Sequence, residues 1–125
     1  MSSKILGIYG EEQACKYLQN RGYVILKKNF RNKLGEIDLI AQDGKVICFI
    51  EVKFRKSLNF GEPFESVHPN KCRKIARVAL SYLKYTFNSV EIPSRFDVVS
   101  IYEDVNKEQR IEHIVSAFDL TYISH

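Results

Sequence analysis

The architecture of this chain follows from two runs of residues, Gly35-Glu36-Ile37-Asp38-Leu39-Ile40-Ala41 and Phe49-Ile50-Glu51-Val52-Lys53. Successive side chains of a strand point to opposite faces, so both runs predict strands with one polar and one apolar face. Ile37, Leu39 and Ala41 are expected on the apolar face of the first. Between the runs, Asp43-Gly44 is a strong signal for a two-residue hairpin turn. We therefore predict an antiparallel hairpin.

This hairpin brings two acids and a lysine onto one face. With Asp43-Gly44 as the turn, Gln42 pairs with Lys45, and Asp38 and Glu51 become diagonal neighbours with Cβ atoms about 7 Å apart. Carboxylates across such a gap, with water, suit Mg²⁺. Lys53 lies on the same face, where its ammonium can orient a water or stabilise charge on phosphorus, and its neutral amine can help to deprotonate the water. The pattern favours phosphodiester hydrolysis; the alternative is an exposed face whose Glu-Lys pairs serve solubility.

The rest of the chain predicts one α/β domain over residues 1–125. At 125 residues, one compact domain is expected. Apolar periodicity indicates a helix over about residues 4–20, and Gly22 follows where a helix end favours positive φ. Pro69 opens a second helix that runs to Phe87. Including the two strands of the hairpin, five strands are expected, over residues 23–31, 36–41, 46–53, 95–102 and 111–118. The predicted order is α-β-β-β-α-β-β, a mixed five-stranded sheet flanked by helices.

The positive charge is concentrated in two segments. The formal net charge is +4, and ten of the nineteen Lys and Arg residues lie in residues 21–34 and 68–88, which contain no acid. Cations around a cluster of acids are typical of proteins that process phosphate polymers. We expect nucleic acid as the partner and select four candidate contacts, which are Arg31, Arg55, Lys71 and Lys74.

Several other classes of protein are disfavoured. No apolar run approaches the roughly 20 residues that span a bilayer, and no signal-peptide block follows Met1, so we expect a cytoplasmic protein without membrane association. The three cysteines form no CxxC pair, so buried reduced thiols are expected rather than disulfides or a zinc knuckle. Gly7-x-x-Gly10 matches neither of the common nucleotide-binding loops, so ATP-driven chemistry is not indicated.

Motifs along most of the chain resemble a known group of proteins. They are Gly7, Gly10-Glu11, Ala14, Tyr17-Leu18, Gly22-Tyr23, Asn29-Phe30-Arg31, Gly35 to Ala41, Glu51-Val52-Lys53, Phe60-Gly61 and Arg95-Phe96-Asp97-Val98-Val99. This pattern is similar to the PD-(D/E)xK nuclease superfamily, with its restriction-endonuclease-like core. It resembles more closely the bacterial YraN family, which is related to archaeal Holliday junction resolvases.

The resemblance implies roles for particular residues. It maps the metal-binding acids onto Asp38 and Glu51, with Mg²⁺ or Mn²⁺ as the cofactor, and the catalytic lysine onto Lys53. The glutamate of the resolvases' first helix falls on Glu11, with Glu12 as the neighbouring alternative. The proline of the superfamily motif is absent here, a position that varies widely in the superfamily.

The roles of other residues near these motifs are less sharply defined. Glu36 is a ligand, an acid that supports the ligands, or a solvated turn residue. Asn29 and Arg31 either help to hold the substrate backbone or are ordinary strand residues. Arg55 either contacts a phosphate or is solvated at a strand end. Asp97 is expected to be structural, paired with a nearby cation.

The leading hypothesis is a metal-dependent endonuclease that hydrolyses phosphodiester bonds in DNA, with branched DNA as one candidate substrate. Cleavage of a four-way junction would favour a two-fold homodimer. The alternative is a catalytically silent nucleic-acid-binding module on a nuclease scaffold. A protein-interaction domain is disfavoured, because its acids would have no reason to face Lys53.

Overall fold

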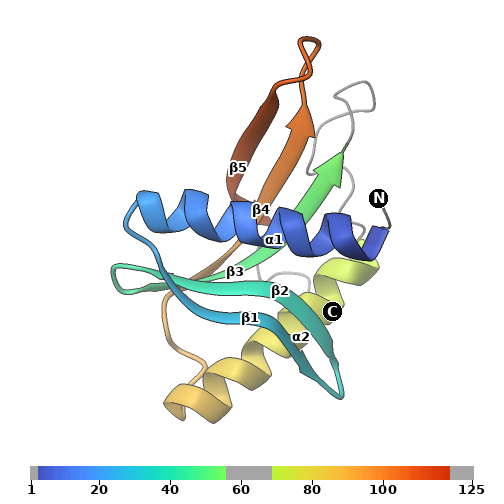
Figure 1. Ribbon diagram of the computed structural model, residues 1–125. Helices are drawn as coiled ribbons and strands as arrows, with labels where there is room; N and C mark the ends of the chain where they lie inside the picture. The colour runs from blue at the N-terminus through green and yellow to red at the C-terminus, as the bar shows by residue number, and fades with distance from the viewer. Residues whose placement is uncertain (1–2, 56–68, 119–125) are drawn as a thin grey trace.

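The elements follow the predicted order. The computed structural model describes residues 3–55 and 69–118, so Phe60-Gly61 lies outside the described residues. The elements are α1 (Ser3–Asn20), β1 (Val24–Asn32), β2 (Gly35–Asp43), β3 (Val46–Arg55), α2 (Pro69–Phe87), β4 (Ser94–Glu103) and β5 (Gln109–Phe118) (Figure 1). The order α-β-β-β-α-β-β is therefore confirmed.

The strands form one mixed sheet in the order β1-β2-β3-β4-β5. Neighbouring strands are antiparallel except β3 and β4, which are parallel. Parallel neighbours cannot be joined by a tight turn, and α2 lies in the connection between β3 and β4. The predicted mixed five-stranded α/β sheet is confirmed. Neither α1 nor α2 is long and apolar enough to cross a membrane.

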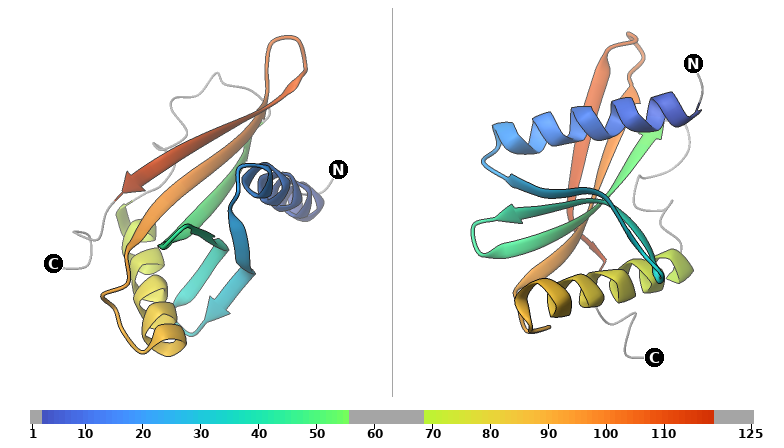
Figure 2. Two further views of the ribbon diagram at one scale, coloured as in Figure 1. Left: turned by 90° about the vertical axis from the view of Figure 1, so that its left-hand side faces the viewer. Right: turned by 60° about the horizontal axis from the view of Figure 1, so that its bottom comes forward.

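The two helices cover opposite faces of the sheet (Figure 2). On one face Ala14 and Leu18 of α1 pack in a buried cluster with Leu39 and Ile50. On the other face α2 contributes its buried stripe to a second cluster with Phe49 and Phe96. Burial of both faces explains why the central strand β3 begins with an unbroken apolar run, Val46 to Ile50. The three cysteines are buried free thiols, as predicted.

The end of α1 shows the expected glycine geometry. Gly22 has φ +89°, in the left-handed region that favours glycine. The Tyr23 amide donates to the Leu18 carbonyl and the Gly22 amide to the Gln19 carbonyl, each at 3.0 Å. This pair of bonds is a Schellman motif. It turns the chain back so that β1 begins directly beside the helix.

The hairpin between β2 and β3 forms, but its predicted register is wrong. Asp43 pairs with Val46 and Gln42 with Ile47, so the turn residues are Gly44 and Lys45 rather than Asp43 and Gly44. Gly44 has φ +61°, as the first central residue of a type II′ turn requires. A register shift of two residues does not by itself move a side chain to the other face of the sheet.

One face assignment is also wrong. Ile37 packs in the cluster under α2, whereas Leu39 and Ala41 pack under α1, so the alternation breaks at Asp38. The residue opposite Asp38 on β1 is Asn29, whose φ of +51° is not that of a regular strand. The irregular stretch of the β1–β2 ribbon therefore lies at the candidate site.

Candidate active site

The candidate site lies where β2 separates from β3. Counted from the turn, the last hydrogen-bonded pair between these strands is Leu39 and Ile50, so the pairing stops just short of Asp38. Asp38 would come next, directly across from Glu51 rather than diagonal to it. Instead of a ladder bond, Asp38 Oδ2 accepts a hydrogen bond of 2.8 Å from the Val52 amide. At this fork, where β2 separates from β3, the hydrogen bond from Val52 holds the Asp38 carboxylate beside Glu51.

Glu51 is a buried carboxylate held by two lysines. Its side chain is only 8% exposed, and Lys53 Nζ lies 3.6 Å from Glu51 Oε1. Lys71, from the first turn of α2, donates a hydrogen bond to the same oxygen. A buried charge is costly unless it is paired, so the two ammonium groups compensate the burial of Glu51. Lys53 therefore faces Glu51 as predicted from the sequence.

Asp38 is in an unfavourable electrostatic environment. Burial, followed by the negative charge of Glu51, raises the pKa of Asp38 to about 7. Glu11 adds to the increase, whereas the Val52 hydrogen bond and the charge of Lys71 oppose it. Repulsion between close carboxylates is relieved by a proton or by a cation. Asp38 and Glu51 therefore make a place where positive charge is favoured.

The two lysines have opposite pKa shifts. For Lys53, burial and then the neighbouring charge of Lys71 lower the pKa, although Glu51 opposes the change. For Lys71, burial also acts to lower the pKa, but the hydrogen bond and charge of Glu51 outweigh it and the net pKa is raised. Lys53 is therefore the lysine that releases a proton more easily, and Lys71 is the more firmly charged.

Glu11 reaches the site from α1 with the help of Asn29. Asn29 Nδ2 donates a hydrogen bond of 2.8 Å to Glu11 Oε2, and Glu11 acts on the pKa of Asp38. Glu11 is partly buried, whereas Glu12 is exposed. Of the two alternatives, Glu11 is the one near the acids. Asn29, for which the sequence left two interpretations, links β1 to α1 through this bond.

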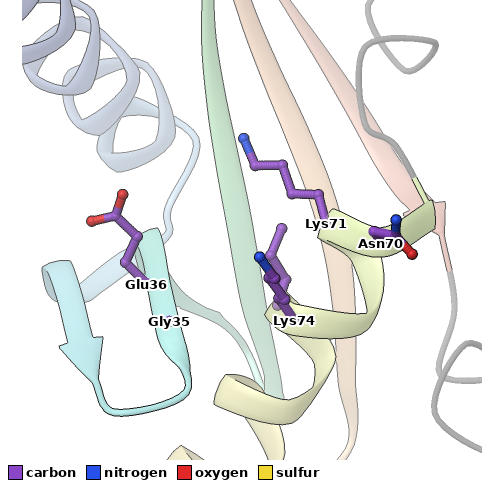
Figure 3. A pocket seen from close by; sticks show the side chains of 6 residues that line it. Gly35, Glu36, Asn70, Lys71 and Lys74 are labelled. Atoms are coloured by element: carbon purple, nitrogen blue, oxygen red, sulfur yellow. The ribbon is translucent and has the colours of Figure 1, made fainter.

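A pocket of about 470 Å³ lies beside these residues. Glu36 of β2 and Lys71 and Lys74 of α2 line it from opposite sides (Figure 3). Glu36 is exposed and pairs with Arg31, with 2.9 Å between Glu36 Oε2 and Arg31 Nε. The pocket therefore joins Lys71, which binds Glu51, to the basic surface of α2.

The four candidate nucleic-acid contacts have different positions. Lys71 is part of the site, because it binds Glu51. Lys74 is exposed on the pocket wall, and Arg31 is exposed and paired with Glu36. Arg55 is the last residue of β3, and its side chain lies outside what the structure describes. No sequence pattern predicted that Lys71 would contact Glu51.

The donor set suits a hard divalent cation with few protein ligands. Within residues 3–55 and 69–118, no group of three or more His, Cys, Asp and Glu side chains is arranged to hold a metal. Asp38 and Glu51 supply two carboxylates whose mutual repulsion a cation would relieve. Mg²⁺ is commonly bound through one or two carboxylates and keeps several waters. The residues present therefore fit Mg²⁺ or Mn²⁺ with water completing the coordination.

A second polar cluster lies on the α1 face of the sheet. Asp97 is fully buried, and Arg95 Nε lies 3.2 Å from each of its carboxylate oxygens. His113 Nε2 is 2.8 Å from Asp97 Oδ2, and the Ser116 amide donates to Oδ1 at 2.9 Å. Burial acts to raise the pKa of Asp97, but these hydrogen bonds and the charge of Arg95 outweigh it and lower the pKa. The predicted pairing of Asp97 with a cation is confirmed, and His113 is an additional partner.

Comparison with known proteins places the chain in a family. Residues 10–101 match the uncharacterised protein family UPF0102, and the chain belongs to this family. A UPF0102 protein of Geotalea uraniireducens is 46% identical over 120 residues, covering 96% of this chain and 94% of the relative. UPF0102 proteins of Geobacter sulfurreducens and Chlorobium limicola are 42% and 46% identical, covering 96% and 90% of this chain and 93% and 91% of the relatives.

Proposed function

We propose that this protein is a Mg²⁺-dependent or Mn²⁺-dependent nuclease that hydrolyses phosphodiester bonds in DNA. The observation that carries the proposal is the buried Glu51, placed between Lys53 and Lys71 and beside Asp38, whose pKa is raised by burial and by the charge of Glu51. The resemblance to the PD-(D/E)xK superfamily supports the same assignment. Branched DNA and a homodimeric enzyme are the finer parts of this proposal.

Asp38 and Glu51 would hold the cation. When bound there, the ion supplies Lewis acidity toward the phosphoryl oxygens and neutralises the two carboxylates. Lys71 now compensates Glu51, and a cation at Glu51 would take over that compensation. Lys71 also lines the adjoining pocket, where its charge would attract a phosphate of the substrate.

Lys53 has the properties of the group that handles the proton. It is partly buried, its pKa is lowered, and it lies 3.6 Å from Glu51. From this position it can orient the attacking water, accept its proton and stabilise charge on phosphorus. Glu11, held by Asn29, lies where it can accept a hydrogen bond from the same water or support a second ion.

The decisive experiment is a metal-dependent cleavage assay on branched and linear DNA. We expect Glu51→Ala and Asp38→Ala to abolish cleavage, while DNA binding in metal-free buffer survives because the basic surface is intact. Lys53→Met should slow cleavage by about 100-fold or more, as the loss of a positioned acid or base does. Equal loss of binding and cleavage in Glu51→Ala would show that the fold, not the chemistry, was affected.

Glu11 and Glu12 give a matched pair of variants. Glu11→Ala should slow cleavage by about 10- to 100-fold, the usual effect of removing a group that supports metal ligands. Glu12→Ala removes an exposed carboxylate from the next position of the same helix and should leave the rate unchanged. Equal rates for the two variants would remove Glu11 from the site.

A silent nucleic-acid-binding module is the second candidate function. It is favoured by the bond between Lys71 and Glu51, which already satisfies the carboxylate, and by the lack of a three-residue metal group among the described residues. This candidate predicts salt-dependent binding with no nicking of junctions, flaps, single strands or RNA in Mg²⁺ or Mn²⁺. The cleavage assay therefore separates the two candidates directly.

A further inference from the structure

A groove leads away from the candidate site between the β1–β2 hairpin and α2. It consists of three adjoining hollows. The first, beside Lys71, shares Gly35 and Glu36 with a second of about 340 Å³. The second shares Asn32 with a third of about 570 Å³, which ends at Tyr85. We refer to this path from Lys71 to Tyr85 as the hairpin–helix groove.

The walls of the hairpin–helix groove are basic. Neither β1 nor α2 contains an acidic residue. Lys71 and Lys74 line its end near the site, and Lys27 lines its far end. Glu36 is the acid on its lining, and its charge is offset by Arg31. The groove is therefore complementary to a polyanion along its length.

The far end of the groove is aromatic. Tyr85 is 93% exposed, on the part of α2 that lines this hollow. Phe30 and Tyr82 form the wall beside it, with ring centroids 5.3 Å apart in an edge-to-face arrangement. A single exposed aromatic side chain is ordinary, but here it adjoins Lys27 in a concave surface. Cations that track a backbone and an aromatic ring that stacks on bases are the combination that binds single strands.

The length of the groove suits a short single strand. Lys71 and Tyr85 are fourteen positions apart on α2, which corresponds to about 21 Å along the helix axis. At the roughly 3.4 Å per phosphate of one B-form strand, that length holds about six nucleotides, and fewer if the strand is stretched. A blunt duplex cannot use Tyr85 in this way, because its base faces are stacked on one another.

We propose that the hairpin–helix groove holds an unpaired strand of DNA, with Tyr85 stacked on a base and Lys74 on a phosphate. This inference rests on the proposed function and names its substrate class, which is DNA with a single-stranded segment next to the scissile bond. Flaps and splayed arms belong to this class, and blunt linear duplexes do not.

The test is binding in metal-free buffer, measured by fluorescence anisotropy with a single-stranded oligothymidine and a blunt duplex of equal length. Tyr85→Ala should weaken binding of the single strand by about 5- to 100-fold, the range for loss of one stacking side chain, and binding of the duplex by less than about twofold. Tyr85→Phe keeps the ring and should bind as the wild type does.

Lys74 has a matched control on the other helix. Lys74→Ala should reduce the dependence of single-strand binding on salt by about one ion, as loss of one phosphate contact does. Lys16 is exposed on α1, which covers the opposite face of the sheet, so Lys16→Ala should leave that dependence unchanged. Equal effects of the two variants would show that net charge, rather than the groove, determines binding.

Other outcomes overturn the groove or the proposed function separately. Wild-type affinity of Tyr85→Ala for the single strand, or equal losses for single strand and duplex, would overturn the groove. Tighter binding of an RNA oligonucleotide of the same length would overturn its assignment to DNA. If Tyr85-dependent binding is found without cleavage in Mg²⁺ or Mn²⁺, the proposed hydrolysis fails while the groove stands. If flapped and blunt DNA are cut alike by the wild type and by Tyr85→Ala, the groove fails while hydrolysis stands.

Discussion

Asp38 and Asp97 both lie on the central sheet and are both shielded from water, but their surroundings shift their pKa values in opposite directions. Asp97 has Arg95, His113 and the Ser116 amide as partners, and its pKa is lowered. Asp38 has one amide as a hydrogen-bond donor and a carboxylate as its neighbour, and its pKa is raised to about 7. Burial alone therefore does not identify a functional acid.

The partners separate a structural carboxylate from a candidate catalytic one. Asp97 is satisfied within the chain, so nothing further is needed to stabilise its charge. Asp38 and Glu51 repel each other, and that cost is recovered only when a proton or a cation arrives. The repulsion between these two carboxylates, at the fork between β2 and β3, therefore lowers the stability of the folded chain until a proton or a cation binds there. Four measurements test this contrast.

The largest effect is expected at Asp97. Asp97→Ala leaves the partly buried Arg95 with Asp43 as its remaining carboxylate partner, and removal of one member of a buried ion pair costs about 3 to 5 kcal/mol. For a domain of this size that corresponds to a fall in Tm of about 10 °C or more. Thermal and urea unfolding followed by circular dichroism measure it. Under the same conditions Asp38→Ala should cost less than about 1 kcal/mol, and similar losses for both variants would erase the contrast.

The second effect is the pH dependence of stability that Asp38 introduces in metal-free buffer. Its pKa is about 7 in the folded chain and about 3.9 when unfolded, so between these values the folded state binds more protons. The free energy of unfolding must then fall as pH rises through this window. Asp38→Asn cannot ionise and should be more stable than the wild type by about 1 to 3 kcal/mol at pH 8.

Below about pH 3 the same two proteins should be nearly equally stable, because Asp38 is then largely protonated in both states. Asp97 should contribute in the opposite sense, because its lowered pKa adds stability above the unfolded value that is lost as pH falls. Urea unfolding at several pH values tests both signs. A difference between wild type and Asp38→Asn that does not change with pH would contradict the raised pKa.

The third effect is stabilisation by divalent metal. Mg²⁺ or Mn²⁺ at about ten times its dissociation constant should add about 1.4 kcal/mol to the free energy of unfolding at pH 8, because only the folded state brings Asp38 and Glu51 together. Asp38→Asn and Glu51→Ala should lose this gain, and Glu12→Ala should keep it. The midpoint of thermal unfolding, followed against metal concentration, provides the measurement. A gain of the same size in all four proteins would place the metal elsewhere.

Most of the fold could be predicted because its signals are local. The alternation of polar and apolar residues predicted the strands, and the apolar stripe from Cys72 to Leu83 predicted α2. Gly22 predicted the end of α1. The register of the hairpin could not be fixed, since a glycine fits either central position of a two-residue turn and a shift of two preserves the faces. Ile37 was misplaced because the strand loses its alternation where β2 leaves β3, which depends on tertiary structure.

The site could be predicted only where its residues share the hairpin. Asp38, Glu51 and Lys53 lie on paired strands, so parity placed them together before any packing was known. Lys71 contacts Glu51 because α2 packs across the sheet, and no spacing along the chain encodes that contact. The choice between Glu11 and Glu12 depends on the rotation of α1 about its axis, which the packing of Ala14 and Leu18 against the sheet sets.

The smallest effect is expected at Glu36, an exposed carboxylate that completes the comparison. Its pair with Arg31 has side chains that are 56% and 75% exposed, and such pairs contribute about 0 to 1 kcal/mol. Glu36→Gln should therefore change the free energy of unfolding by less than about 0.5 kcal/mol at any pH. If Glu36 only balances Arg31 at the groove, this variant should bind a single strand slightly better and cleave at nearly the wild-type rate. A loss of metal-induced stabilisation in Glu36→Gln would instead make Glu36 a third acid of the metal site, and would extend the repelling cluster from two carboxylates to three.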